Sequence, residues 1–416
     1  MKRFVAIIIV CCLIFNMIGM VDYFILDSTV LANESYINVI ELGISNNGAD
    51  VTAKLNSLPS GNYYFPKGIY GIDGKDYQGF KPKSNSSYHF ENGAVLKVLT
   101  NGYTHYAGIL IRNCDNVTLI NPTIEGDRIT HDYTSEGTHE WGHGIIITDG
   151  CGKIVINNPY IYDVTGDGID FICEGSDVTV NNLTIKRARR QGISIESAGV
   201  LNINGGLIED ISGTSPEAGI DIEPYKMGQH LDDVTISNII TRRTKQGLLF
   251  ANLHMANNYK VSINNSTFDG IYVCNSEGAV EGEININDPI INGSNVALYW
   301  TNAYVNMNIR NPIFVVDNLN NDGTREGIFR FSEQDKENGD IIGGLTCTNA
   351  QILNSQSECR DTRIFNFSNS SKSTVTDIHI SVSKSNMTNT IWATTPSSLR
   401  TVKLSEPKNI NVTIRY

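Results

Sequence analysis

Short stretches of alternating apolar and polar residues recur along most of the chain and predict β-strands. One block reads apolar, any, apolar, polar, Asn, two variable positions and apolar, as in residues 154–161 and 178–185. A second block reads Gly, apolar, any, apolar, as in residues 168–171 and 219–222. A period of two, enriched in β-branched residues and interrupted by Gly and Asn, is typical of short strands joined by tight turns.

The asparagine position of the first block recurs at nearly regular intervals. It is occupied by Asn121, Asn158, Asn182, Gly205, Asn238, Asn265, Asp288, Asn311 and Asn349, with spacings of 37, 24, 23, 33, 27, 23, 23 and 38 residues. Three short strands per turn of about 23 residues describe a parallel β-solenoid whose coils stack about 4.8 Å apart. Asn tolerates a left-handed turn, and its amide can bond the equivalent Asn one coil away. The sequence therefore predicts an all-β, single-stranded solenoid of about ten coils.

These features resemble the pectin-lyase-like superfamily of right-handed parallel β-helices, over nearly all of the chain after residue 32. The Asn positions resemble that superfamily's asparagine ladder, and residues 44–72, with Tyr-Tyr-Phe-Pro-Lys-Gly-Ile-Tyr at 63–70, resemble its N-terminal cap. The resemblance implies that the Gly-Ile blocks form the first sheet and that a carbohydrate site lies in the groove beside it. It does not imply one activity, because lyases, hydrolases, epimerases, phage tailspikes and adhesins share the fold.

The first 32 residues are typical of an export segment. Lys2 and Arg3 precede an apolar run over residues 4–15, and Val-Leu-Ala at 30–32 fits a cleavage site. An uncleaved membrane anchor is the alternative, because the apolar character continues to residue 21. We expect the rest of the chain to be secreted or on the cell surface as one β-helix domain: 33–90 as N-terminal cap and first coils, 91–315 as regular coils with groove loops, and 316–416 as terminal coils and cap.

The net charge argues against one class of partner, and the spacing of the cysteines argues against two kinds of site. The 416 residues include 32 Lys and Arg against 44 Asp and Glu, a net charge of −12, which argues against nucleic acid as the partner. Six of the eight cysteines follow the export segment, and no Cys-x-x-Cys pair predicts a zinc ribbon or a redox site. Bridges from Cys151 to Cys173 and from Cys347 to Cys359 are alternatives to buried free thiols.

Carboxylates gather at outward positions of the Gly-Ile strands. The apolar neighbours point inwards, so Asp170 and Asp221 point outwards two coils apart, with about 9.6 Å between their backbones and Ser194 between them. Carboxyl groups of inverting glycosidases are about 6.5–9.5 Å apart. Glu196 and Glu223 are one coil apart, about 4.8 Å, which is nearer the retaining separation of about 5–5.5 Å. A solvated acidic face without catalytic function is the alternative.

The turns beside these strands add an acid and two cations. Thr165-Gly166-Asp167-Gly168-Ile169-Asp170 is similar to the Asn-Thr-Asp-Gly-x-Asp stretch of polygalacturonases. The next coil, 191–196, lacks the paired Asp of that family, and its His-Gly and Arg-x-Lys motifs do not follow in order, so a polygalacturonase proper is not expected. Arg189 and Arg190 are candidates to bind a uronate or sulfate group, or to balance the carboxylates.

The insertion 126–143 is expected to lie over the same groove. Its candidate substrate contacts are Asp127, Arg128, His131, Glu140 and Trp141. His143, or His131, could serve as base or proton shuttle, and a lid or hydrogen-bonded plug is the alternative function of the loop. Residues 139–143 read His-Glu-Trp-Gly-His, but the zinc-protease motif needs a helix. Gly142 and the strand that follows predict none here, so no metal site is expected.

Together these features favour a polysaccharide-active enzyme, most simply a glycosidase that cleaves an acidic or complex glycan by acid–base catalysis. Asp170 and Asp221 are the leading pair of catalytic candidates. The further catalytic candidates are Asp167, Glu196, Glu223 and His143, and Tyr225 is a further candidate for substrate contact. A polysaccharide lyase or C5-epimerase on uronate polymers is the first alternative. It could use a Ca²⁺ ion, whereas the hydrolase needs no cofactor. A non-catalytic glycan-binding or adhesion β-helix is the second alternative. The sequence does not indicate an oligomeric state.

Overall fold

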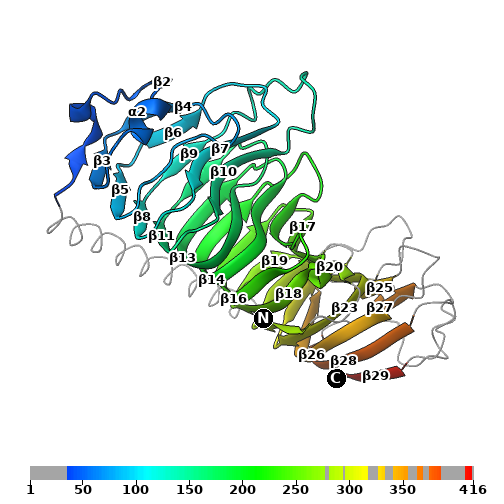
Figure 1. Ribbon diagram of the computed structural model, residues 1–416. Helices are drawn as coiled ribbons and strands as arrows, with labels where there is room; N and C mark the ends of the chain where they lie inside the picture. The colour runs from blue at the N-terminus through cyan, green and yellow to red at the C-terminus, as the bar shows by residue number, and fades with distance from the viewer. Residues whose placement is uncertain are drawn as a thin grey trace, which may run out of the picture.

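The strands stack in parallel to form one elongated solenoid of about ten turns, with 63% strand and 4% helix (Figure 1). The structure is a computed structural model and describes residues 35–276, 281–293, 296–316, 327–332, 341–354, 363–368, 374–385 and 408–414. The predicted all-β parallel solenoid is therefore confirmed, and the predicted export segment lies outside the described residues.

Each coil contributes strands to three faces. The first face contains β7 (His105–Ile111), β10 (Trp141–Thr148), the starts of β13 (Ile169–Lys186) and β14 (Gln191–Glu209), β15 (Ala218–Ile222), β17 (Gln246–Ala251), β20 (Ile271–Ser276), the start of β23 (Leu298–Arg310), β25 (Gly327–Ser332) and β27 (Arg363–Ser368). These strands are the predicted Gly-Ile blocks and their continuation.

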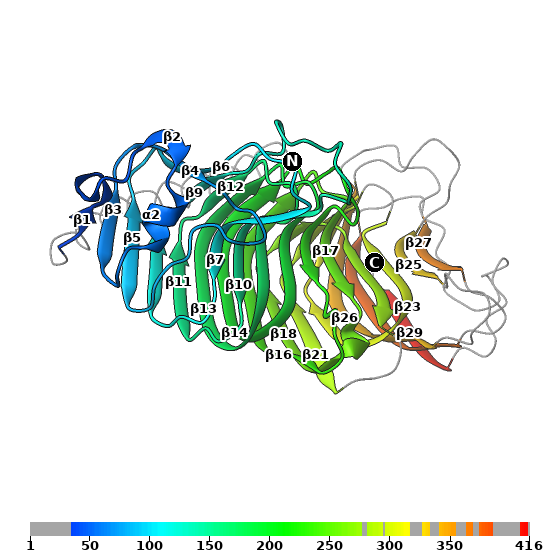
Figure 2. The ribbon, with the colours of Figure 1, turned by 45° about the horizontal axis from the view of Figure 1, so that its top comes forward.

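The second face runs along the solenoid beside the first. It contains β1 (Ile37–Asn38), β3 (Asn62–Phe65), β5 (Ser86–Phe90), β8 (Val117–Ile120), β11 (Lys153–Asn157), the middles of β13 and β14, most of β16 (Gln229–Arg242), β18 (Ala256–Asn264), β21 (Gly282–Asn287), the end of β23, β26 (Ile341–Asn354), β28 (Thr374–Ser385) and β29 (Lys408–Ile414). Figure 2 shows β11, β13, β14 and β16 lying side by side across the middle of the molecule.

The third face closes each coil. It contains β2 (Asn47–Asp50), β4 (Gly68–Ile72), β6 (Ala94–Val98), β9 (Thr123–Glu125), β12 (Tyr160–Tyr162), the ends of β13, β14 and β16, β19 (Thr267–Asp269), β22 (Ile290–Gly293), β24 (Ile313–Val316) and the ends of β26 and β28. The helical segments described are η1 (Val39–Leu42), α2 (Thr52–Asn56) and η2 (Leu253–Met255), and none is long and apolar enough to span a membrane.

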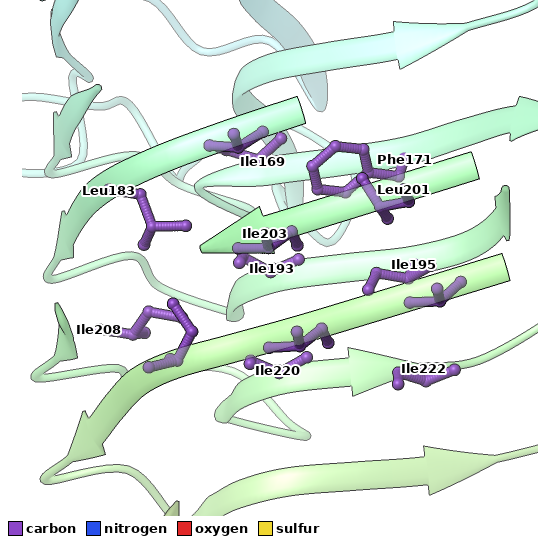
Figure 3. Close-up of a cluster of buried hydrophobic side chains, with 14 of the residues drawn as sticks. Ile169, Phe171, Leu183, Ile193, Ile195, Leu201, Ile203, Ile208, Ile220 and Ile222 are labelled. Carbon is purple, nitrogen blue, oxygen red and sulfur yellow. The ribbon is translucent and has the colours of Figure 1, made fainter. Parts of the chain in front are cut away.

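The core is a set of stacked aliphatic rows inside the coils. Ile169, Ile193 and Ile220 occupy one position of successive first-face strands, and all three are fully buried (Figure 3). Full burial of one such side chain contributes about 1.5–3 kcal/mol relative to leaving it exposed. Because alternate side chains point inwards, the residue between two core residues must point outwards.

The asparagine positions form the predicted ladder at the turn between the second and third faces. Asn121, Asn158 and Asn182 have φ angles of 55°, 54° and 53°. The Asn158 side-chain amide donates to Asn121 Oδ1 at 2.8 Å, and Asn182 donates to Asn158 at 3.3 Å. Gly205 takes the same left-handed conformation with a φ of 76°. The regular recurrence of Asn is thus a requirement of the turn.

A second column, of glycines, begins each first-face strand. A Cβ atom on Gly144, Gly168 or Gly192 would lie 2.5–2.6 Å from a backbone carbonyl oxygen of the next coil. No larger residue fits there without moving backbone, so the chain enters the first face through the same tight corner in these three coils. This fixes the positions of the outward-pointing residues that follow.

The described cysteines are buried free thiols. Cys114, Cys151, Cys173, Cys274 and Cys347 form no disulfide. The bridge considered between Cys151 and Cys173 is therefore wrong, and Cys359 lies outside the described residues.

Candidate functional site

The outward column of the first face has the predicted composition. Strand pairing places Ile146, Asp170, Ser194, Asp221 and Leu249 side by side on successive coils. The two aspartates are thus two coils apart, about 9.6 Å between backbones. The column is apolar at both ends, at Ile146 and Leu249. Its acidic part is the two aspartates with Ser194 between them.

The next outward column departs from the prediction. Thr148 pairs with Ile172, but Ile172 pairs with Ser197 instead of Glu196. The expectation that Glu196 lies in the outward column is wrong because β14 carries one extra residue here, a β-bulge that sets Glu196 out of the column. Bulges re-aim side chains and are common next to functional sites.

The aspartates of this face are buried. Asp167, Asp170 and Asp221 are 1%, 5% and 0% exposed, and Glu196 and Glu223 are partly buried. A solvated acidic face is therefore the wrong description. Within the described part of the chain, Asp167 Oδ1, Asp170 Oδ1, Asp221 Oδ1 and Glu196 Oε2 accept no hydrogen bond.

Burial raises the pKa of every one of these carboxyls. It raises the pKa of Asp167 to about 7 and that of Glu196 to about 8, where the charge of Asp167 adds to the effect. The pKa of Asp170 is raised well above its usual range by burial and then by Glu196 and Asp167, and that of Asp221 by burial and then by Glu223. The pKa of Glu223 is raised in the same way. The site therefore holds protons near neutral pH, as a general acid must.

A chain of polar contacts links the carboxyls across coils. Arg190 Nη1 donates to Asp167 Oδ2 at 3.1 Å and to Gln191 Oε1 at 3.0 Å, and Gln191 Nε2 donates to Asp221 Oδ2. Gln191 is fully buried, and its importance was missed because a lone Gln carries no catalytic signature in sequence. These donors stabilise the ionised forms of Asp167 and Asp221 and leave Asp170 without equivalent support.

His143 lies against the same network. It is 2% exposed, and its Nδ1 accepts a hydrogen bond from the backbone N–H of Asp167 at 3.1 Å. Burial and then the charge of Arg190 lower its pKa to about 3, so the imidazole is neutral at physiological pH. Because Nδ1 accepts, Nε2 carries the proton. This geometry suits a fixed hydrogen-bond donor better than a proton shuttle.

A strap that the sequence analysis did not predict lies at the start of the first face. Residues 73–80 pair along the edge of β7, where Lys75 forms an antiparallel bridge with Tyr106 and Phe80 a parallel bridge with Ile109. Asp76 and Tyr77 have φ angles of 51° and 59°, an uncommon conformation for residues other than glycine. Such backbone strain is retained where surrounding structure enforces it, often at functional sites.

The strap places the ring of Tyr77 against His143 and the outward side of the first face. The ring stacks on His143 with 6.1 Å between centroids and 14° between planes, and it packs on the apolar group of Ala107, Leu110 and Ile146. Its pKa is raised by burial and then by the charges of Asp170, Asp167 and Glu196. Tyr77 is therefore a component of the site that sequence analysis missed.

The insertion 126–143 contains a buried hydrogen-bonded plug. Asp127 Oδ2 and His131 Nδ1 are 2.8 Å apart, and His131 Nε2 and His139 Nδ1 are 2.9 Å apart. The side chains of Asp127 and His131 are 0% exposed. They are thus enclosed within the loop, and their expected contact with substrate stays a prediction that this arrangement does not favour.

Two of the candidate arginine contacts fasten this loop to the next turn. Arg128 Nη1 donates to the carbonyl of Arg187 at 2.7 Å, and Arg189 Nη1 donates to the carbonyl of His139 at 3.0 Å. The Arg189 guanidinium also lies 5.0 Å from the ring centroid of Tyr133. In this structure both cations stabilise loops.

The remaining candidates are more accessible. Trp141 and Tyr225 are 43% and 55% exposed, and Trp141 lies on the same side of β10 as His143, two residues later. The pKa of Tyr225 is raised by burial and then by Glu196 and Asp170, so its ring lies close to those acids. Glu140 is partly buried, and its charge contributes to the raised pKa of Asp167. Trp141 and Tyr225 are therefore the candidates of this group that are exposed enough for a ligand to contact directly.

The His-Glu-Trp-Gly-His segment does not form a helix. It leads directly into strand β10, so its two terminal histidines lack the helical spacing that a zinc-protease site uses. Among the described residues, no group of three or more His, Cys, Asp or Glu side chains is placed to hold a metal ion.

Comparison with known proteins agrees with the fold. The family model described as "Right handed beta helix region" matches residues 69–236. The uncharacterized protein YclG of Bacillus subtilis (strain 168) is 30% identical over 273 residues, which cover 58% of this chain and 45% of YclG, so the match spans less than half of that relative's length.

Among solved structures, the A-module of the mannuronan C-5 epimerase AlgE4 of Azotobacter vinelandii is 11% identical, with a TM-score of 0.50 over 92% of this chain and 98% of that one. The tailspike gp49 of the Acinetobacter baumannii bacteriophage Fri1, a capsular polysaccharide depolymerase, is 12% identical, with a TM-score of 0.46 over 87% and 63%. At such identities the likeness concerns the fold alone, a right-handed parallel β-helix.

Proposed function

We propose that this chain, which has the right-handed parallel β-helix of the pectin-lyase-like superfamily, is a glycoside hydrolase acting on a polysaccharide outside the cytoplasm. The observation that carries the proposal is the group of buried, proton-holding carboxyls on three consecutive coils of one face. Buried carboxyls that accept no hydrogen bond reduce stability. Pairs of acids with raised pKa values are the working parts of glycosidases.

Asp170 is assigned as the general acid and Asp221 as the general base. Burial raises the pKa of both carboxyls. Gln191 donates to Asp221 Oδ2, whereas Asp170 Oδ1 accepts no hydrogen bond within the described residues, so Asp221 is the acid whose ionised form has a fixed donor. Asp170 would protonate the glycosidic oxygen while Asp221 accepts a proton from water on the opposite face of the sugar. Their separation of two coils leaves room for that water, which predicts inversion at the anomeric carbon.

The lyase or epimerase alternative receives less support from the electrostatics. Those reactions remove the proton next to a uronate carboxylate, so a cation must neutralise that carboxylate and a base must be ionised. Arg190 is the cation that acts on these acids, and it is already bound to Asp167. The raised pKa of Tyr77 makes a phenolate base costly at this position.

The proposal is tested by turnover on a panel of neutral, acidic and amino-sugar polysaccharides, measured as reducing ends. Asp170→Asn and Asp221→Asn are expected to lower kcat by about 10²–10⁴-fold. Asp233→Asn is the matched control, because it removes one carboxylate from an exposed pair with Lys260, and it should leave kcat unchanged.

Three other outcomes would contradict the hydrolase. A product with an unsaturated, ultraviolet-absorbing end would identify a lyase. A change of sugar configuration without chain cleavage would identify an epimerase. Glycan binding without any turnover, unaffected by Asp170→Asn and Asp221→Asn, would identify the adhesion alternative.

A further inference from the structure

The surroundings of the candidate site are acidic well beyond the two leading aspartates. The exposed ring of Tyr225 lies near carboxyl groups from three coils, and the pKa of its phenol is raised by burial and then by Glu196, Asp170, Asp149 and Glu174. Its ring therefore marks an accessible region bordered by negative charge.

Positive charge is scarce at the same place. Within the described part of the chain, Arg190 is the cation that lowers the pKa of Asp170, Glu196 and Asp221. It also donates to Asp167, so its charge is already shared. Arg189 is fastened to backbone carbonyls of the neighbouring loop. A polyanionic sugar chain would thus find no unengaged arginine beside these acids among the described residues.

The buried acids also offer acceptors that nothing in the described structure satisfies. Asp167, Asp170 and Asp221 are each at least 95% buried, and each has a carboxyl oxygen without a hydrogen-bond donor. Unsatisfied acceptors of this kind are rare in native proteins and point to an absent partner. A protonated amine brings three donors and one positive charge to such a place.

We propose that this site binds a polysaccharide of amino sugars with free, protonated amines, and that an ammonium group of the chain lies among Asp170, Glu196 and Asp221. The proposal takes the location of the site from the proposed function but not the reaction. It departs from the acidic glycan that the loop arginines suggested in the sequence, because those arginines are occupied by loop contacts. The nearby ring of Tyr225 adds a surface on which a cation is attracted.

The test is calorimetric binding of oligomers of equal length at pH 6, where the free amines are protonated. The probes are hexamers of glucosamine, N-acetylglucosamine and galacturonate. We expect the glucosamine hexamer to bind at least about tenfold more tightly than the acetylated one, with an affinity that falls as NaCl is added. We also expect proton release, read from the dependence of the enthalpy on the buffer, because an incoming cation favours ionised carboxyls.

A pair of variants separates the site from general surface attraction. Glu196→Gln should weaken the glucosamine hexamer at least about fivefold and leave the acetylated hexamer unchanged. Asp233→Asn removes the same charge from an exposed position paired with Lys260 on the second face and should change neither affinity. Equal loss in both variants would overturn the proposal.

Other outcomes are equally decisive. Equal or tighter binding of the acetylated or galacturonate hexamer would overturn the proposal. Binding of Ca²⁺ or Mn²⁺ that abolishes the preference for the glucosamine hexamer would overturn it as well. Tight binding of the glucosamine hexamer without cleavage would support this inference and refute the hydrolase. Cleavage of neutral glycans with no preference for amines would support the hydrolase and refute this inference.

Discussion

Replacing Asp167 by Asn should stabilise the protein at high pH. Burial raises the pKa of the Asp167 carboxyl to about 7, against an ordinary value of 3.8. A carboxyl with a raised pKa makes its full contribution to the free energy of unfolding below pH 3.8, and this contribution is lost as the pH rises through 7. Each unit between the two values corresponds to about 1.4 kcal/mol, so ionising Asp167 in the folded state costs about 4 kcal/mol by pH 8.

The assay is urea denaturation of wild type and Asp167→Asn at pH 4.5, 6 and 8. The two proteins should have similar stability at pH 4.5, because the neutral carboxyl and the amide are nearly the same size. At pH 8 the variant should be more stable by up to about 4 kcal/mol. Ser194→Ala, an uncharged change on the same face, should keep the wild-type pH dependence. Parallel pH profiles for wild type and Asp167→Asn would refute the view that burial governs this acid.

Three further predictions concern other parts of the molecule. Tyr77→Phe should lower kcat by about 10–100-fold if the hydroxyl bonds a carboxyl in the transition state. The melting temperature should change little because the ring contacts are kept. An unchanged kcat would show that the phenol has no part in the mechanism. Glu209 accepts from Arg242 and Arg243, which lower its pKa to about 2, so Glu209→Gln should lower the urea midpoint at pH 7, a difference lost as the pH falls from 4.5 to 2. Cys114 and Cys151 are free thiols on adjacent coils, where the backbone N–H of Gly152 donates to the carbonyl of Cys114 at 2.9 Å. Oxidised glutathione should therefore join them, with loss of two hydrogens by mass spectrometry and a higher melting temperature; five free thiols among the described cysteines after treatment would contradict this.

The fold could be predicted almost completely because its signal is repeated. The turn conformation of Asn158 recurs in coil after coil, and the corner at Gly168 does the same. A period of two then decides that Ile169 points inwards and Asp170 outwards. Each feature depends on neighbours close in sequence or one coil away, and such contacts leave a pattern that the chain itself displays.

The site could be predicted only in part, because burial is not a local property. The alternation gave the positions of Asp170 and Asp221 but suggested that they face solvent. The strap that carries Tyr77 is part of their surroundings, and its position depends on bridges to β7. No periodic pattern in the sequence predicts these bridges. Glu196 was displaced by a single extra residue in β14, which the repeat spacing cannot reveal.

The strap also changes how the solenoid should respond to damage at its N-terminal end. In an ideal repeat protein each coil is stabilised by its two neighbours alone, so fraying at one end stops after a coil or two. Tyr77 departs from this rule, since it leaves the coil of β4 and contacts residues of β7 and β10. Local unfolding of the N-terminal coils should therefore expose acids in the middle of the molecule to water, so that the end of the chain and its centre share one cooperative unit.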